Sequence, residues 1–193
     1  MIKAGVGISS GDDAYAVGVE AAHEAFSFLP EGKANLVIVF SSVAYDQERM
    51  LAGVRSVSGS VLLVGSSTAG EITTAGPAQK HSISVMAIAT DQIQFWGGVG
   101  ENIAEDPRAA GRKVAETVQQ QAGETLKFFM MLPDVLVGNG ADIVRGVLDT
   151  LGPHFPLVGG ASGDDFKFKK TYQYFNDKVY SGVVVGLGMT GDF

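Results

Sequence analysis

The stretches VGSSTAGE at residues 64–71 and VGGASGDD at residues 158–165 decide the fold. Both begin with Val-Gly and continue with small, hydroxylated or acidic side chains. An apolar run precedes each of them, LVIVF at residues 36–40 and FFMML at residues 128–132, with the length and flanks of a buried strand. Equivalent residues are 94 positions apart in the first pair and 92 apart in the second, so the two pairs keep nearly one register.

A third match keeps this register, because GVG at residues 5–7 and GVG at residues 98–100 are 93 positions apart. Chance matches of single glycines would not hold such a spacing, so the sequence contains an internal repeat. We expect one domain over residues 1–193, made of two repeats over about residues 1–91 and 92–193. Each repeat is expected to run strand-helix-strand-helix-strand and to end in an antiparallel extension. This order predicts an α/β fold with mixed sheets and two pseudo-symmetric halves.

Helix start signals separate the expected strands. Short polar or acidic residues that can cap a helix N-terminus precede apolar positions spaced three and four residues apart. The expected caps are Asp12 or Asp13, Asp46, Asp106 followed by Pro107, and Asn139 or Asp142. Near the end of the chain, the pair Asn176-Asp177 lies between two extended segments and suits a hairpin turn.

The composition is that of a folded protein with an acidic surface. Hydrophobic residues make up 46% of the chain and charged residues 18%, and the formal net charge is −7. A negative surface repels phosphate backbones and anionic lipids, so we expect neither nucleic acid nor a membrane as partner. The chain has no cysteine, which excludes disulfides, thiolate catalysis and thiolate metal sites. No apolar run has the length of a membrane helix and the first residues are unlike a signal peptide, so we expect a cytoplasmic protein.

The loops after the third strand of each half form the candidate ligand site. In open α/β sheets, ligands bind beyond the carboxyl ends of the strands, where small residues let backbone amides approach them. The second strands also end in polar residues, and parallel pairing with the third strands would bring these loops to the same crevice. The candidate ligand-binding residues are Ser42, Tyr45, Ser66, Ser67, Thr68, Gly70, Glu71, Gly160, Ala161, Ser162, Asp164 and Asp165.

The residue types in these loops fit an amino acid or a related small carboxylate. The carboxylates of Glu71, Asp164 and Asp165 can hold an ammonium group, while exposed amides and the hydroxyl groups can receive a carboxylate. The alternative is structural, because glycine-rich turns whose acids cap backbone amides are common without any ligand. The sequence leaves both interpretations open. It predicts no metal and no cofactor.

Two other functions compete with ligand binding. Residues 7–11 spell G-x-S-x-G at a strand-to-helix turn, so Ser9 is a candidate hydrolase nucleophile, and the pair Asp164-Asp165 is a candidate for acid–base catalysis. No oxyanion loop or triad acid is identifiable for Ser9, and adjacent residues in an extended segment point in opposite directions. We therefore expect no catalytic activity. The other alternative is a protein-docking module that uses an exposed strand edge or the Phe95-Trp96 region.

The motifs GVGIS, LVIVFSSVAYD, LVGSSTAGEI and LVGGASGDD, in this order, resemble the FIST N-terminal domain, a sensory input domain of microbial signal-transduction proteins. The resemblance spans essentially the whole chain and is most specific over residues 67–72 and 159–165. It implies a non-catalytic cytoplasmic sensor of amino acids or related small molecules. The expected partners are a signalling output domain or kinase and, as a homodimer, a second copy of the chain. The position of Ser66 is often cysteine in the family, so no thiol-dependent role is carried over.

Members of this family normally continue into a FIST C-terminal domain. The chain is therefore either a single-domain version or one from which a C-terminal partner domain is missing. Some relatives are described as haem-based nitric oxide sensors. The matching motifs here contain no histidine, so no axial ligand can be assigned to His23, His81 or His154, and a haem-based sensor is the less favoured alternative.

Overall fold

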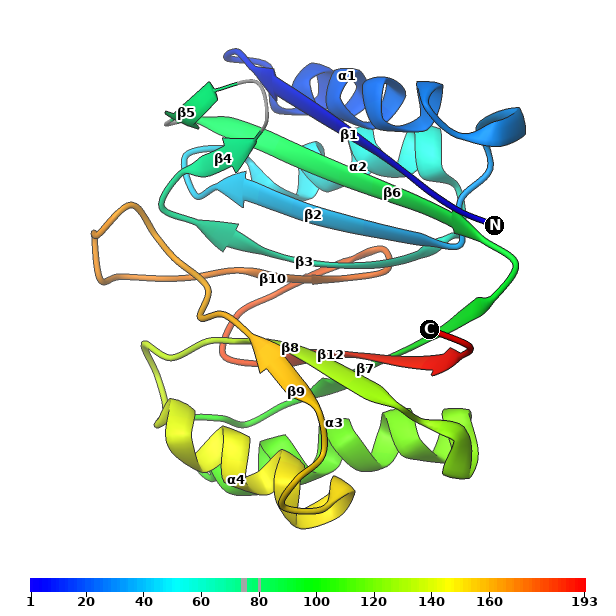
Figure 1. The fold of residues 1–193 in the computed structure, drawn as a ribbon. Coiled ribbons are helices and arrows are strands. Elements are labelled where there is room, and N and C mark those ends of the chain that lie inside the picture. The colour runs from blue at the N-terminus through cyan, green and yellow to red at the C-terminus, as the bar shows by residue number, and fades with distance from the viewer. Residues whose placement is uncertain (74–75, 80) are drawn as a thin grey trace.

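The computed structural model describes residues 1–73, 76–79 and 81–193, which form a mixed α/β fold in four layers (Figure 1). Two sheets lie face to face, and two helices cover the outer face of each sheet. Helices α1 and α2 lie on the first sheet, and α3 and α4 lie on the second. Their bounds are α1 (Ala14–Ser27), α2 (Gln47–Ser58), α3 (Pro107–Ala122) and α4 (Gly140–Leu151).

The first sheet has six strands in the order β1-β6-β2-β3-β10-β11. Strands β2 and β3 are parallel, and all other neighbours in this sheet are antiparallel. The parallel pair brings the carboxyl ends of β2 and β3 to one edge, which is the arrangement that the candidate loops require in order to share a crevice. The bounds are β1 (Ile2–Ser10), β6 (Ser82–Thr90), β2 (Leu36–Ser42), β3 (Leu62–Thr68), β10 (Gln173–Phe175) and β11 (Lys178–Tyr180).

The second sheet has four strands in the order β7-β12-β8-β9, which repeats the order β1-β6-β2-β3. Strands β8 and β9 are parallel, like their equivalents β2 and β3. The predicted α/β class, with mixed sheets and two pseudo-symmetric halves, is thus confirmed. The bounds are β7 (Ile93–Gly100), β12 (Val184–Gly191), β8 (Phe128–Pro133) and β9 (Leu157–Gly159).

The antiparallel extensions of the two halves are placed differently. In the first half, β4 (Glu71–Thr73) and β5 (Gly76–Gln79) form a two-stranded sheet of their own. In the second half, the hairpin of β10 and β11 crosses over and pairs with β3 of the first sheet. Asn176 and Asp177 form the turn of that hairpin, as predicted.

Strand β2 has an apolar layer on each of its faces, which explains its uninterrupted apolar run. Val37 and Val39 belong to the core beneath α1 and α2, while Leu36 and Ile38 belong to the core between the two sheets. Side chains alternate along a strand, so a strand between two apolar layers has no polar face. A third core, which includes Phe129, lies between the second sheet and α3 and α4.

The helices begin where their capping residues predict. The side chains of Asp13, Asp46, Asp106 and Asn139 accept hydrogen bonds from backbone N–H groups in the first turns of α1, α2, α3 and α4. These bonds satisfy donors that have no partner inside the helix. None of the helices in the described part of the chain is long and apolar enough to cross a membrane.

Glycines let the two helices of each pair approach closely. A Cβ atom at Gly53 in α2 would lie 2.2 Å from the carbonyl oxygen of Tyr15 in α1, and one at Gly146 in α4 would lie 2.0 Å from that of Arg108 in α3. Gly53 and Gly146 are 93 positions apart, which is the spacing of the repeat. The duplication therefore extends from the strands to the packing of the helices.

Candidate ligand-binding site

The structure brings the two predicted loops into direct contact through Ser67 of β3. The Ser67 N–H donates to the carbonyl oxygen of Tyr172 at 2.8 Å, and its hydroxyl donates to the carbonyl oxygen of Gly163 at 2.8 Å. In return, the Gly163 N–H donates to the carbonyl oxygen of Ser67 at 2.8 Å. Ser67 is fully buried, so these bonds hold the loops together without an intervening ligand.

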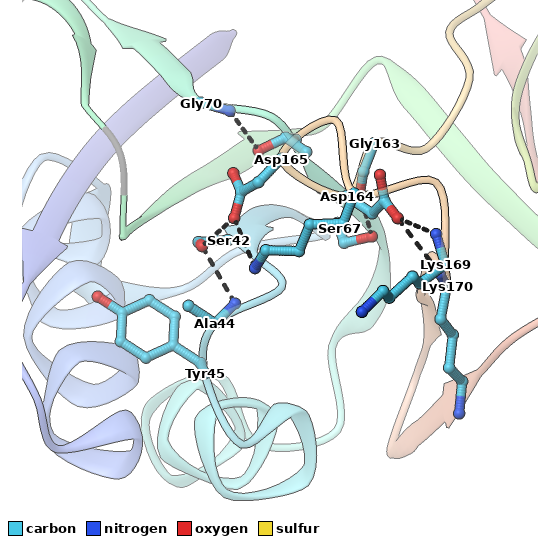
Figure 2. A network of polar contacts seen from close by, with 12 residues as sticks. Ser42, Ala44, Tyr45, Ser67, Gly70, Gly163, Asp164, Asp165, Lys169 and Lys170 are labelled. Atoms are coloured by element: carbon cyan, nitrogen blue, oxygen red, sulfur yellow. Dashed lines mark hydrogen bonds and ion pairs between the residues drawn. The ribbon is translucent and has the colours of Figure 1, made fainter.

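Asp164 has the structural role of a loop cap. Its carboxylate accepts hydrogen bonds from the backbone N–H groups of Lys169 and Lys170 at 2.7 and 3.2 Å (Figure 2). It also accepts the backbone N–H of Phe168 at 3.0 Å. Burial raises the pKa of this carboxyl group, but the hydrogen bonds from the surrounding amides outweigh burial and hold the pKa below its usual value. The oxygens are directed at the backbone of their own loop, as in the structural alternative that the sequence left open.

Asp165 points the other way and joins its loop to the end of β2. The hydroxyl of Ser42 donates to Asp165 Oδ2 at 3.3 Å, and Lys167 Nζ lies 3.5 Å from the same oxygen. Ser42 Oγ in turn accepts the N–H of Ala44 at 3.2 Å (Figure 2). Asp164 and Asp165 therefore bond to different partners.

Glu71, at the start of β4, is a buried carboxyl group between two hydroxyl groups. Thr68 Oγ1 donates to one carboxylate oxygen and Ser82 Oγ to the other. Burial raises the pKa of Glu71, the two hydroxyl donors lower it, and the negative charge of Asp165 raises it further. The net direction is upward, so Glu71 is easier to protonate than an exposed glutamate.

Tyr45 lines an open hollow at the start of α2. Its ring packs against that of His81 with 4.4 Å between centroids, and its hydroxyl donates to the carbonyl oxygen of His81 at 2.8 Å. The hollow, of about 540 Å³, is also lined by Asp13, Asp46 and Arg49. The carboxylates of Asp13 and Asp46 already accept hydrogen bonds from backbone N–H groups as helix caps, which leaves fewer of their oxygen lone pairs for a ligand.

The other candidate residues lie at three places. Ser66 lies opposite Gln173 of β10, whose side-chain amide donates to Ser162 Oγ at 3.0 Å, and all three residues are buried. Gly70 donates its N–H to Thr68 Oγ1 at 3.3 Å. Gly160 and Ala161 lie apart from this cluster, in a hollow beside β9.

An apolar groove that sequence reasoning missed lies between the two sheets, and we call it the intersheet groove. Its volume is about 560 Å³, within the range of about 300–1,000 Å³ that is typical of small-molecule sites. Ser84 supplies a hydroxyl group to an otherwise apolar lining. The groove is lined by Val6, Ile38, Phe40, Ile72, Ser84, Met86 and Met130.

The intersheet groove adjoins the polar cluster around Glu71. Ser84 and Ser82 are two residues apart on β6, so both side chains point to the same face of the sheet, roughly 7 Å apart along the strand. Ser82 is the residue that donates to Glu71. An apolar hollow with a few polar groups at one end is the usual composition of a small-molecule site.

The structure also places the residues of the competing hypotheses. The hydroxyl of Ser9 donates to Glu20 Oε2 at 2.7 Å. Trp96 donates its Nε1–H to Thr190 Oγ1 at 3.2 Å and packs on the core beneath α3 and α4, while Phe95 packs in the core between the sheets. Among the described residues, no three His, Asp or Glu side chains are grouped so that they could hold a metal ion.

The family model of the FIST N domain matches residues 35–193, which is more than half of the chain. The chain therefore belongs to the FIST N domain family, and the resemblance seen in its motifs is confirmed. No curated protein sequence matches it significantly.

Two solved structures of cyanuric acid hydrolase have a related arrangement of elements. One, from A. caulinodans, is 8% identical with a TM-score of 0.48, and the match covers 100% of this chain and 72% of that chain. The other is 12% identical with a TM-score of 0.42, and the match covers 99% of this chain and 68% of that one. Likeness at this level carries no argument about activity.

Proposed function

We propose that the protein is a non-catalytic sensory domain that binds a small molecule in the intersheet groove. The family supplies the sensory class, and the groove is the observation that carries the proposal. Both sheets contribute to it, since Met130 comes from β8 of the second half and the other lining residues come from the first half. A ligand held there would contact both halves at once.

The lining defines the chemistry of the ligand we propose. Aliphatic, aromatic and thioether side chains favour an apolar body, and Ser84 can bond one polar group. The amino acid or small carboxylate expected from the loops would place its side chain in the groove. Its charged groups would then lie toward the cluster of Ser42, Asp165 and Lys167.

Binding between the two sheets gives a route from ligand to signal. A ligand shifts an equilibrium between two arrangements only by its difference in affinity for them. The lining residues of the two halves belong to different layers, so a change in their separation changes the contacts that the ligand makes. We propose that this change is read by a signalling output domain or kinase.

A thermal-shift screen tests the proposal. Apolar amino acids, small carboxylates and their uncharged analogues are added to the protein, and hits are expected to raise the melting temperature. The variant Met86→Glu places a charge in the groove and is expected to abolish the shift. The control is Leu136→Glu, because Met86 and Leu136 are both 37% exposed but Leu136 does not line the groove. Equal shifts in both variants would place the ligand elsewhere.

The hydrolase alternative has its own test. The Ser9 hydroxyl donates to the carboxylate of Glu20, so a base lies within hydrogen-bond reach. A serine nucleophile also needs donors that hold the oxyanion, however, and no oxyanion loop is identifiable in the sequence. Asp164 and Asp165 are bonded to amides and to Ser42 and Lys167. We expect a serine-directed fluorophosphonate to leave the protein unlabelled. Labelling that is lost in Ser9→Ala would favour the enzyme instead.

A further inference from the structure

The first sheet is completed by a hairpin that inserts a tyrosine beside a glycine. Strand β10 pairs antiparallel with β3, and Tyr174 lies opposite Gly65. The Tyr174 side chain is fully buried in the core beneath α1 and α2. Its hydroxyl lies 2.7 Å from Ser41 Oγ and donates to Gln47 Oε1 at 2.5 Å. The hairpin thus closes the edge of β3 and fills the space next to Gly65.

The equivalent edge of the second sheet is bare. Gly159 of β9 is the counterpart of Gly65, since a Cβ atom at either glycine would lie 2.1 Å from a carbonyl oxygen of the neighbouring parallel strand. The described strands of the second sheet end at β9. The residues that precede these glycines also differ in exposure, since Val64 is 0% exposed in the core between the sheets and Val158 is 47% exposed. A bare edge of this kind is a template for a further strand.

In the second half, the place equivalent to the one that Tyr174 fills is a hollow. A hollow of about 590 Å³ lies along β9, between the strand and the start of α4. Its lining is mainly apolar and includes Met131, Pro133, Val135, Val144 and Leu157. Gly140 borders it at the position equivalent to Gln47, which contacts Tyr174 in the first half.

The chain carries a hairpin that matches this edge. Two residues separate β4 from β5 in the sequence, as two residues separate β10 from β11. Counting back from these two residues, Glu71, Ile72 and Thr73 of β4 correspond to Gln173, Tyr174 and Phe175 of β10. Ile72 takes the place of the buried Tyr174, and although it borders the intersheet groove its exposed fraction is 80%. Among the described residues, β4 and β5 pair only with each other.

We propose that the β4–β5 hairpin of one copy of the chain adds to the bare edge of β9 in a second copy. Strand β4 would pair antiparallel with β9, and Ile72 would enter the hollow beside Gly159. The contact repeats between molecules the one that β10 makes with β3 inside the molecule, where backbone bonds give the pairing and one side chain anchors it. The occupant is another copy because this hairpin is the chain's own counterpart of the one that closes β3.

The oligomeric state tests the inference. Light scattering and sedimentation are expected to show association of the wild-type chain that increases with concentration. Ile72→Asp removes the anchor, and Gly160→Asp puts a charge beside the edge at a position where a Cβ atom meets no neighbour within 4 Å. Each variant alone is expected to be monomeric. Phe28→Asp is the control, because Phe28 is also an exposed apolar side chain, 59% exposed, but lies at the end of α1.

Mixing the two variants makes the test specific to this contact. The Gly160→Asp chain keeps its hairpin and the Ile72→Asp chain keeps its edge, so an equimolar mixture is expected to form a complex of two chains. A mixture that stays monomeric would overturn the proposal, as would variants that still associate. A wild-type chain that is monomeric at every concentration would also overturn it, and the edge would then be left to a hairpin from another protein.

Discussion

The acidic residues that the sequence singles out have different environments in the structure. Asp164 accepts three amide N–H groups, whereas Glu71 is enclosed by hydroxyl groups and has little contact with water. Burial opposes ionisation of both, and amide donors overcome it at Asp164 only. The type of residue could be predicted from the sequence, but most of the partners could not, because the donors to Asp164 come from residues 168–170 and one donor to Glu71 comes from β6.

Asp164→Asn is expected to lower the free energy of unfolding by about 1–3 kcal/mol at neutral pH, because hydrogen bonds to a charged acceptor are lost. The pKa of Asp164 is lowered in the folded state. Its contribution is therefore present above the pKa of the unfolded chain and is lost as the pH falls through the folded-state pKa. Urea denaturation between acidic and neutral pH measures this, and an unchanged pH profile in Asp164→Asn would contradict it.

Glu71→Gln is expected to have the opposite pH dependence. The pKa of Glu71 is raised in the folded state, so its stabilising contribution is present at low pH and is lost as the pH rises through the folded-state pKa. The free energy of unfolding of Glu71→Gln, taken relative to that of the wild type, should therefore be higher at neutral pH than at acidic pH. Urea denaturation of both proteins at two pH values checks this, and a variant that is relatively more stable in acid would refute it.

At the scale of elements, the helices and the buried strands could be predicted because their signals are local. Capping residues and the spacing of apolar residues depend only on neighbours in the chain. The crossing of β10 and β11 to the first sheet could not be predicted, because it depends on the free edge of β3. The intersheet groove could not be predicted for a related reason. Ile38 and Phe40 belong to an apolar run, and such a run has the same sequence whether the face of its strand is packed against another sheet or lines an open groove.

Gly53→Ala tests the packing of α1 on α2. Alanine normally stabilises a helix relative to glycine by about 0.5–1 kcal/mol. Here the added Cβ atom would meet the carbonyl oxygen of Tyr15, so we expect a loss of about 1–3 kcal/mol instead. Chemical denaturation gives the sign directly, and a stabilised variant would show that the helices can move apart at no cost.

At the scale of the whole molecule, duplication places two like halves face to face, and the candidate site arises from their contact. The loops chosen from the sequence do meet, but Ser67 and Gly163 bond to each other directly. The open space lies farther along the sheets, in the intersheet groove. The position of the groove depends on how the two sheets overlap, so it cannot be predicted from the sequence of one repeat alone.

The most direct measurement is a methyl NMR titration of the methionines with a compound that stabilises the protein. Met86 and Met130 line the groove, while Met50 of α2 is buried in the core between the helices and the first sheet. The account predicts that the methyl resonances of Met86 and Met130 shift together with saturation while that of Met50 stays in place. A saturating compound that leaves both groove resonances unchanged would contradict it.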